Sequence, residues 1–302
     1  MLVLQTDLPL KLFARGKVRD SYDLGDRLLM VATDRVSAFD VVLPCAIPGK
    51  GVVLNKLSAF WFEKTASLIP NHFETGVDDL KVLGPFSMGG DDYHYPDYLI
   101  GRSMMVKKAW RVPVECVVRG YLSGSAWAEY RQNGTINSLA MPTGLQESQE
   151  LPQPLFTPTT KEETGHDQAL HGTDLEKLVG QNTARELEER SLEVYEYARK
   201  YAMTRGFIIA DTKMEFGIVE GRLILIDELL TPDSSRFWDV NLYQVGKPQP
   251  SFDKQPLRDW LVQSGWNEKP PAPMLSEEII ELTSQRYEEV YRRLTGQSLE
   301  RG

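Results

Sequence analysis

FIIADTKMEFGIVEGRLILIDELL, residues 207–230, contains two apolar runs separated by a Glu-Gly pair at 220–221. Two such runs around a short turn that contains glycine are typical of a β-hairpin. If the pair forms a tight turn, Glu215 lies opposite Ile226 or Asp227, depending on the register of the loop. The sequence therefore predicts a hairpin on which two carboxylates from neighbouring strands converge.

These two carboxylates can be interpreted in two ways. They lie beside the apolar sequence LILI, so as unpaired anions they would repel each other and be costly to desolvate. A divalent cation would resolve that conflict, since Mg²⁺ held by carboxylates commonly bridges substrate phosphates in phosphoryl transfer. Alternatively, the acids form the charged end of a hairpin and pair with Lys213 and Arg236. The spacing alone leaves both interpretations open.

Upstream of the hairpin, the sequence predicts further strands and one helix. Residues 16–32 favour two extended segments about a turn near residues 24–26. Residues 53–69 place apolar side chains at helical spacing. A further strand pair is expected over residues 103–109 and 114–119.

Loops and two helices complete the prediction. The stretch 84–97 is rich in Gly, Asp and Pro, and 141–173 carries four prolines and little periodicity. We expect the second stretch to be a functional loop or disordered. The clearest helix spans 183–205 and is stopped by Gly206, and a second amphipathic helix begins with Ser276 as its N-cap.

The composition is that of an ordinary globular protein, with 41% hydrophobic and 25% charged residues among 302. A net charge of -9 argues against nucleic-acid binding, which needs a basic surface, although a few local arginines can hold one anionic substrate. Cys45 and Cys116 are too few for a disulfide framework and lack the spacing of a zinc site. No apolar run approaches the roughly 18 residues that span a bilayer, and the N-terminal residues lack a secretion pattern. We therefore expect a soluble, cytoplasmic chain.

A possible phosphate clamp lies in ECVVRGYLSGSAW, residues 115–127. Arg119 offers a guanidinium fork, Ser125 a hydroxyl, and the glycines between them exposed backbone amides. Arg236 could supply a second fork. Taken alone, the segment is equally consistent with a solvated arginine beside a serine that caps a helix.

Two lysines are further candidates for phosphate contacts. Gly16 and Lys17 open a strand pair, where glycine lets the backbone approach a phosphate and lysine adds a charge. Lys161 follows the threonine-rich sequence TPTT, for which an ordinary polar loop is an equally good interpretation. Neither segment is a Walker A loop, because the chain contains no GxxxxGK[ST].

Seven motifs follow one another between roughly residues 16 and 239: GKVRDSYD, ATDRVSAFD, PGKGVVLNKLSAFWF, VPVECVVRGYLSGSAW, PLFTPTTKEETGHD, IIADTKMEFG and LIDELLTPDSSRFW. Each motif alone is moderately specific, whereas seven in this order are highly specific. By these motifs the chain resembles the SAICAR synthetase family.

The resemblance implies an α+β fold in two parts, with a nucleotide cleft related to ATP-grasp and protein-kinase architectures. Residues 1–112 would form a strand-rich nucleotide-binding domain, and 113–302 an α+β domain with the substrate and metal site.

The resemblance also implies a reaction of de novo purine biosynthesis. An ATP-dependent ligase joins L-aspartate to carboxyaminoimidazole ribonucleotide (CAIR) through an acyl phosphate, which gives the succinocarboxamide SAICAR, ADP and phosphate. The expected cofactors are ATP and Mg²⁺, and the expected partners are these small molecules, not nucleic acid or a membrane. The chain would be a monomer or a homodimer.

Carried over position by position, the resemblance assigns roles to individual residues. Gly16, Lys17 and Lys161 match residues that contact ATP. Glu215 and Asp227 match Mg²⁺ ligands, and Glu115 matches a further contact to the metal or to a substrate carboxylate. The clamp for the ribonucleotide phosphate comprises Arg119, Ser125 and Arg236. Asp211 and Lys213 match catalytic residues beside the reacting carboxylate, and Ser37 and Asp40 lie in a loop that approaches the imidazole and the incoming aspartate.

Two other functions compete with this one. A small-molecule kinase with the same Mg-ATP site would turn over ATP on its acceptor without aspartate and form no amide. A nucleotide-sensing protein would bind ATP without releasing ADP. Asp211, Lys213, Glu215 and Asp227 together argue against the sensor, because binding alone does not require all four.

Overall fold

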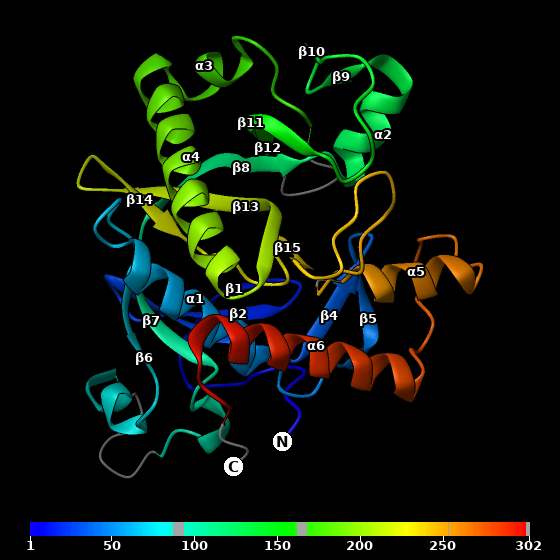
Figure 1. The fold of residues 1–302 in the computed structure, drawn as a ribbon. Coiled ribbons are helices and arrows are strands. Elements are labelled where there is room, and N and C mark those ends of the chain that lie inside the picture. The colour runs from blue at the N-terminus through cyan, green and yellow to red at the C-terminus, as the bar shows by residue number, and fades with distance from the viewer. Residues whose placement is uncertain (87–93, 162–167, 253, 300–302) are drawn as a thin grey trace.

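The computed structural model describes residues 1–86, 94–161, 168–252 and 254–299, and it has the expected α+β fold. Two larger antiparallel sheets lie one above the other in Figure 1, with helices against both. Within these residues, no helix is both long and apolar enough to cross a membrane.

The first sheet is built from the N-terminal part of the chain. Its strand order is β1-β2-β3-β7-β6, and the turn predicted near residues 24–26 joins β2 to β3 as expected. Helix α1 packs against β3, β6 and β7 and buries Leu57 and Trp61. The bounds are β1 (Lys11–Arg15), β2 (Arg19–Asp23), β3 (Arg27–Ala32), β6 (Phe73–Gly76), β7 (Ser103–Lys107) and α1 (Lys50–Thr65).

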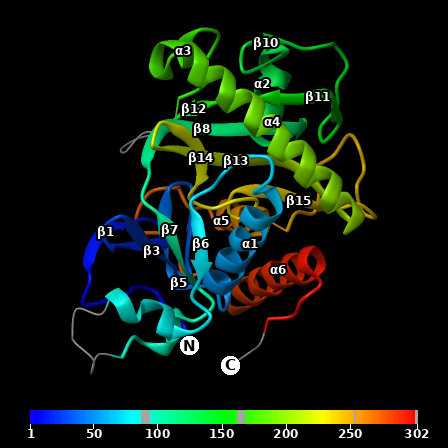
Figure 2. The same ribbon diagram turned by 90° about the vertical axis from the view of Figure 1, so that its left-hand side faces the viewer.

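A separate small hairpin, β4 (Arg35–Ala38) and β5 (Val41–Ala46), packs against residues near the C-terminus. Its apolar side chains form one cluster with Leu257 and Leu261 of α5 (Gln255–Gln263) and with Leu275. Helix α6 (Glu277–Thr295) follows and lies alongside α1 (Figure 2). Ser276 caps α6 as predicted, since its side chain accepts a hydrogen bond from the Ile279 amide.

The second sheet has the order β11-β8-β13-β14, with β12 paired to β8 and β15 paired to β13. The predicted hairpin is confirmed: β13 and β14 pair antiparallel, and Glu215 lies opposite Ile226. Helix α4 (Gln181–Thr204) covers β8 and β13 (Figure 1). The strands are β8 (Trp110–Tyr121), β11 (Glu150–Phe156), β12 (Thr159–Thr160), β13 (Phe207–Val219), β14 (Arg222–Ile226) and β15 (Ser235–Asp239).

Smaller elements surround these layers. Helix α2 (Gly124–Asn133) leads into a short hairpin of β9 (Thr135–Ile136) and β10 (Leu139–Ala140), and α3 (Asp174–Val179) precedes α4. The 3₁₀ helices η1 (Leu80–Phe86) and η2 (Asp97–Leu99) flank residues 87–93, so half of the loop expected at 84–97 lies outside the described residues.

Two predictions of local structure were wrong. The strands expected over 103–109 and 114–119 exist but do not pair with each other, because β7 belongs to the first sheet and β8 to the second. The stretch 141–173 is not structureless, since it contributes β11 and β12. β11 reads ELPQPLF and lies at the edge of its sheet, which is where strands tolerate prolines. Residues 162–167 of this stretch lie outside the described residues.

Backbone hydrogen bonds connect the two sheets. Residues Pro70 and His72 form hydrogen bonds with Leu225 of β14, and the carbonyl of His72 accepts from the Lys107 amide of β7. The domain boundary expected between residues 112 and 113 stays a prediction. It lies within β8, and α5 and α6, which follow it, pack against residues that precede it.

Packing of α4 against β8 restricts position 120 to glycine. The buried Tyr195 hydroxyl donates a hydrogen bond to the Ile209 carbonyl at 2.7 Å and passes directly over Gly120. A Cβ at position 120 would lie 2.8 Å from Cζ of Tyr195, and closer still to its hydroxyl oxygen. The glycine therefore serves the packing of α4 on the sheet.

We predict that Gly120→Ala lowers the free energy of unfolding by about 1–3 kcal/mol, as overpacking of a core does. Adding Tyr195→Phe removes the closest atom but not the ring, so part of the loss should be recovered in the double variant. Urea denaturation of the four proteins in the cycle measures this. Gly84→Ala, whose Cβ would meet open space, is the matched control. Strict additivity of the two substitutions would contradict the proposed clash.

Candidate active site

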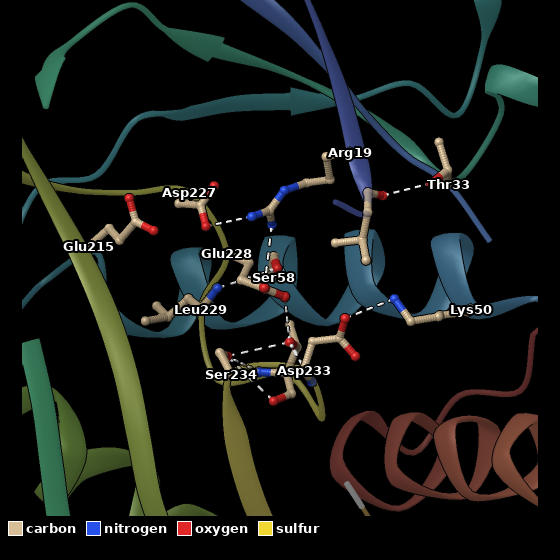
Figure 3. Close-up of polar contacts among 12 residues, drawn as sticks. Arg19, Thr33, Lys50, Ser58, Glu215, Asp227, Glu228, Leu229, Asp233 and Ser234 are labelled. Atoms are coloured by element: carbon tan, nitrogen blue, oxygen red, sulfur yellow. Dashed lines mark hydrogen bonds and ion pairs between the residues drawn. The ribbon is translucent and has the colours of Figure 1, made fainter. Parts of the chain in front are cut away.

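The carboxylates predicted on the hairpin lie together where the second sheet faces β2 and α1. Glu215 of β13 and Asp227, which follows β14, are neighbours in Figure 3. The chain then continues as a loop, residues 227–234, that leads into β15. The prediction that Glu215 and Asp227 converge across one turn is consistent with this geometry.

Arg19 of β2 contacts the start of this loop from the opposite sheet. Its Nη2 donates to Oδ2 of Asp227 at 2.5 Å, and Nη1 lies 3.7 Å from Oε1 of Glu228 (Figure 3). Burial alone would lower the pKa of the guanidinium, but the carboxylates of Asp227, Glu228 and Glu215 outweigh that effect and raise it. Arg19 is therefore a fixed cation beside the acidic hairpin.

The two hairpin carboxylates respond in opposite directions to their surroundings. Burial and the charge of Asp227 raise the pKa of Glu215, and the pull of Lys161 offsets this only in part. Burial also tends to raise the pKa of Asp227, but Arg19 and Lys161 lower it overall. A carboxylate whose pKa is raised by burial and by a neighbouring anion gains from an additional cation.

Lys161 and Lys213 supply positive charge from the other side. Nζ of Lys161 lies 2.8 Å from Oε1 of Glu215 and 3.3 Å from Oε1 of Glu115. Nζ of Lys213 lies 2.5 Å from Oε2 of Glu115. Burial would raise the pKa of Glu115, yet the two lysines keep it below its usual value. The four side chains form a continuous row of alternating charge across β12, β8 and β13.

The predicted set of three metal ligands is not assembled in this row. Among the described residues, no three His, Cys, Asp or Glu side chains are grouped so as to hold a metal ion. The physical reason is that the Lys161 ammonium lies between Glu115 and Glu215. Two carboxylates are nevertheless sufficient for Mg²⁺, which commonly takes one or two from the protein and the rest of its shell from phosphates and water. Glu215 and Asp227 fit that requirement.

The residues predicted to clamp a phosphate form a second cluster. Arg119 of β8 donates to Oγ of Ser125 at 3.2 Å, to Oγ1 of Thr157 at 3.0 Å and to Oδ2 of Asp211 at 3.2 Å. Arg236 of β15 donates to the same oxygen of Asp211. Two guanidinium groups, one hydroxyl and the start of α2 thus converge, and Asp211 is the anion that they share.

Gly16 and Lys17 form the turn between β1 and β2. The guanidinium of Arg35 donates to both of their carbonyl oxygens, at 2.9 and 3.0 Å, which fixes the backbone of the turn. The ammonium of Lys17 is exposed and lies 2.5 Å from Oδ1 of Asp40. The turn thus presents its lysine toward the hairpin of β4 and β5.

Ser37 and Asp40 belong to that hairpin. Ser37 lies in β4 opposite Val42, and Asp40 is at the tip with Phe39. Both tip residues have positive φ, 50° and 62°, as in a two-residue turn that usually contains Asn-Gly. Phe39 makes an edge contact with Trp266, with the ring centroids 6.2 Å apart. This contact anchors a tip that its own sequence does not favour.

Sequence reasoning missed several residues of the site. Arg19 begins β2 and is two residues from Lys17 of the preceding turn, and alternation within β2 places it on the same face as Ser21 and Asp23. That alternation was the available signal. Glu228 and Asp233 belong to one loop, but Lys50, the partner of Asp233 in Figure 3, comes from a segment far away in the chain, and no local pattern links the two.

Comparisons with known proteins agree on one family. The family model described as SAICAR synthetase matches residues 12–273. The chain is similar to a phosphoribosylaminoimidazole-succinocarboxamide synthase of Thermodesulfovibrio yellowstonii, with 51% identity over 97% of this chain and 99% of the relative. A solved SAICAR synthase of Saccharomyces cerevisiae, complexed with SAICAR, is 42% identical, with a TM-score of 0.89 over 99% of both chains. A solved SAICAR synthetase in complex with ADP is 25% identical, with a TM-score of 0.67 over 95% of this chain and 99% of that one.

We predict that Asp211→Asn makes the protein dependent on phosphate for stability. The substitution leaves Arg119 and Arg236 without their shared anion and should lower the free energy of unfolding by about 3 kcal/mol. Inorganic phosphate that binds this fork should restore part of the loss through linkage. Thermal unfolding with phosphate, against chloride at equal ionic strength, measures the effect. An equal phosphate response in the unsubstituted protein would contradict it.

Proposed function

This chain belongs to the SAICAR synthetase family, and from that premise we propose how its residues divide the reaction. The protein is an ATP-dependent ligase of purine biosynthesis that joins L-aspartate to CAIR. The kinase and the nucleotide sensor are set aside, because relatives that match nearly the full chain bear the name of the ligase.

The chemistry requires an activated carboxylate. A carboxylate is a poor electrophile, so phosphoryl transfer from ATP would first convert it to an acyl phosphate, which has a stable leaving group. The neutral amine of aspartate then attacks the carbonyl carbon and phosphate departs. Because three anionic reactants meet, the protein contributes mainly by positioning them and by neutralising charge.

The nucleotide is assigned to the row of alternating charge. Glu215 and Asp227 would hold Mg²⁺, which when bound neutralises charge on the transferred phosphoryl group. The Gly16-Lys17 turn would contact phosphates from the first sheet. Lys161 reaches the same place from β12 and is already poised between two carboxylates. The observation that carries this assignment is the convergence of Arg19, Lys161 and two acids from both sheets on one hairpin end.

The ribonucleotide is assigned to the arginine cluster. Arg119, Ser125 and Arg236 would take its phosphate, in place of the internal contacts that they make in the absence of substrate. Asp211 and Lys213 would then lie beside the reacting carboxylate.

The other roles follow from the remaining elements. Ser37 and Asp40 approach from the β4–β5 hairpin and would meet the imidazole and the amino acid. Glu115, which contacts two ammonium groups, fits an electrostatic support for Lys161 and Lys213 better than a metal ligand. The cytoplasmic location stays a prediction.

The reaction itself is tested by ADP release with and without L-aspartate, in the presence of CAIR and Mg²⁺. We expect sustained ADP release and one succinocarboxamide per ADP only when aspartate is present. Stoichiometric product formation would support the ligase. Sustained ADP release that is indifferent to aspartate and yields no amide would refute it.

Asp227→Asn tests the metal assignment. Asparagine tolerates the positive φ of 69° at this position and has nearly the shape of aspartate, and Arg19 keeps Glu228 as a second anion, so the protein should still fold with a loss of about 1–3 kcal/mol in the free energy of unfolding. Loss of the charge should lower Mg²⁺-dependent kcat by about 10²-fold or more, as loss of a preorganised electrostatic contact does. Steady-state kinetics over a Mg²⁺ titration measures this. Asp239→Asn, which removes an ion pair to Arg293 elsewhere, is the control, and an unchanged kcat in Asp227→Asn would eliminate the assignment.

A further inference from the structure

The loop of residues 227–234 connects the two proposed binding clusters. Asp227 at its start is assigned to the metal and nucleotide, and Arg236 just beyond its end to the ribonucleotide phosphate. Asp233, between them, points away from both clusters and into the protein beside the N-terminus of α1 (Figure 3). Its side chain is only 3% exposed.

Three side chains from three elements surround this buried carboxylate. Lys50 at the start of α1 donates to Oδ2 at 2.8 Å, and Lys254 at the N-cap of α5 lies 3.0 Å from the same oxygen. The Tyr287 hydroxyl of α6 donates to Oδ1 at 2.5 Å. The Lys50 ammonium also lies 5.9 Å from the centre of the Tyr287 ring.

Burying this cluster costs more desolvation free energy than neutralising one carboxylate with one cation would. Lys50 is fully buried, and Lys50 and Lys254 share one carboxylate. Each lysine therefore loses hydration but gains only a share of the attraction to one anion. A buried ion cluster is weak evidence for stability, because well-packed apolar residues often do as well. Its distinctive property is geometric, since charge and hydrogen bonds together allow only one position for Asp233.

The loop needs such an anchor. Asp227 and Leu230 both have positive φ, 69° and 52°, a conformation that residues other than glycine rarely adopt. Within the loop, Thr231 donates to Glu228, and the Ser234 and Ser235 amides donate to the Thr231 carbonyl. These local bonds give the loop its shape, and two further hydrogen bonds tie it to β13 and α1: the Lys213 amide donates to the Ser234 carbonyl, and the Leu229 amide donates to Oγ of Ser58. Asp233 supplies contacts to α1, α5 and α6.

We propose that Tyr287 and Lys254 are positioning residues for the ligase reaction. From the C-terminal helices they hold Asp233, and through it they hold Asp227 and Arg236 at the spacing that the nucleotide and the ribonucleotide require. This inference rests on the proposed roles of those two residues. It gives the C-terminal helices a function at the site, although neither helix carries a residue assigned to a substrate.

The test compares two tyrosines of α6. Tyr287→Phe removes the hydroxyl that Asp233 accepts from, whereas Tyr291→Phe removes a buried hydroxyl one turn later that donates to Gln297. We expect Tyr287→Phe to raise KM for MgATP and for CAIR roughly tenfold, the effect of losing one hydrogen bond to a charged group. KM for aspartate, which is assigned to another hairpin, should stay within about twofold. A purely structural loss would reduce the fraction of active enzyme and leave all three KM values unchanged.

A second pair of variants keeps the proposal testable if Tyr287→Phe folds poorly. Lys254→Met should raise the same two KM values, and Lys254→Arg, which keeps the charge, should restore them to near the unsubstituted values. The proposal is overturned if Tyr287→Phe and Lys254→Met both leave these KM values unchanged. It is equally overturned if Tyr291→Phe raises them as much as Tyr287→Phe does.

Amide hydrogen exchange separates this inference from the site assignment. The Ser234 and Ser235 amides should exchange at least tenfold faster in Tyr287→Phe than in Tyr291→Phe, because the loop has lost its anchor. Unchanged exchange in Tyr287→Phe would refute the positioning role, whatever the kinetics. Faster exchange in Tyr287→Phe would support the anchor. If the kinetics of Asp227→Asn and Arg236→Lys were at the same time unaltered, the proposed function of the loop would be refuted.

Discussion

A carboxylate that leaves water must find a cation, and this constraint organises the structure around the hairpin. The β13–β14 hairpin and the loop after it remove the side chains of Glu215, Asp227, Glu228 and Asp233 largely from water, and the hairpin alone cannot neutralise them. The neutralising groups come from elsewhere, with Arg19 from the first sheet, Lys161 from β12, and Lys50 and Lys254 from two helices. Charge compensation therefore fixes how the two sheets face each other.

The same constraint preorganises the cations that are proposed to meet the substrates. Arg119 and Arg236 share the carboxylate of Asp211, and Lys161 lies between Glu115 and Glu215. Each cation is already held in place by a carboxylate of the protein, so under the proposed assignment an incoming phosphate would meet cations that need little reorientation. This is the preorganisation that a ligase with three anionic substrates needs, because it avoids reorganising solvent during the reaction.

The sequence predicted the parts of the site that depend on local order. The pairing of β13 with β14 follows from a glycine turn between two apolar runs, which limits the partner of Glu215 to Ile226 or Asp227, and the structure has Ile226. The grouping of Arg119 with Ser125 is similarly local. Asp233 and Lys50, in contrast, are 183 positions apart, and burial alone makes them partners. β11 was missed because its prolines suggest a loop, and only its place at a sheet edge makes them compatible with a strand.

Backbone strain shows why the C-terminal segment matters to a site that it does not line. Phe39 and Asp40 at one loop, and Asp227 and Leu230 at another, occupy left-handed conformations that cost of order 1–3 kcal/mol each in strained settings. Such conformations persist only where surrounding contacts favour them. For the first loop that contact is Trp266 against Phe39, and for the second it is Lys254 and Tyr287 around Asp233. Both sets lie between residues 254 and 287, so one C-terminal segment contacts both of these loops.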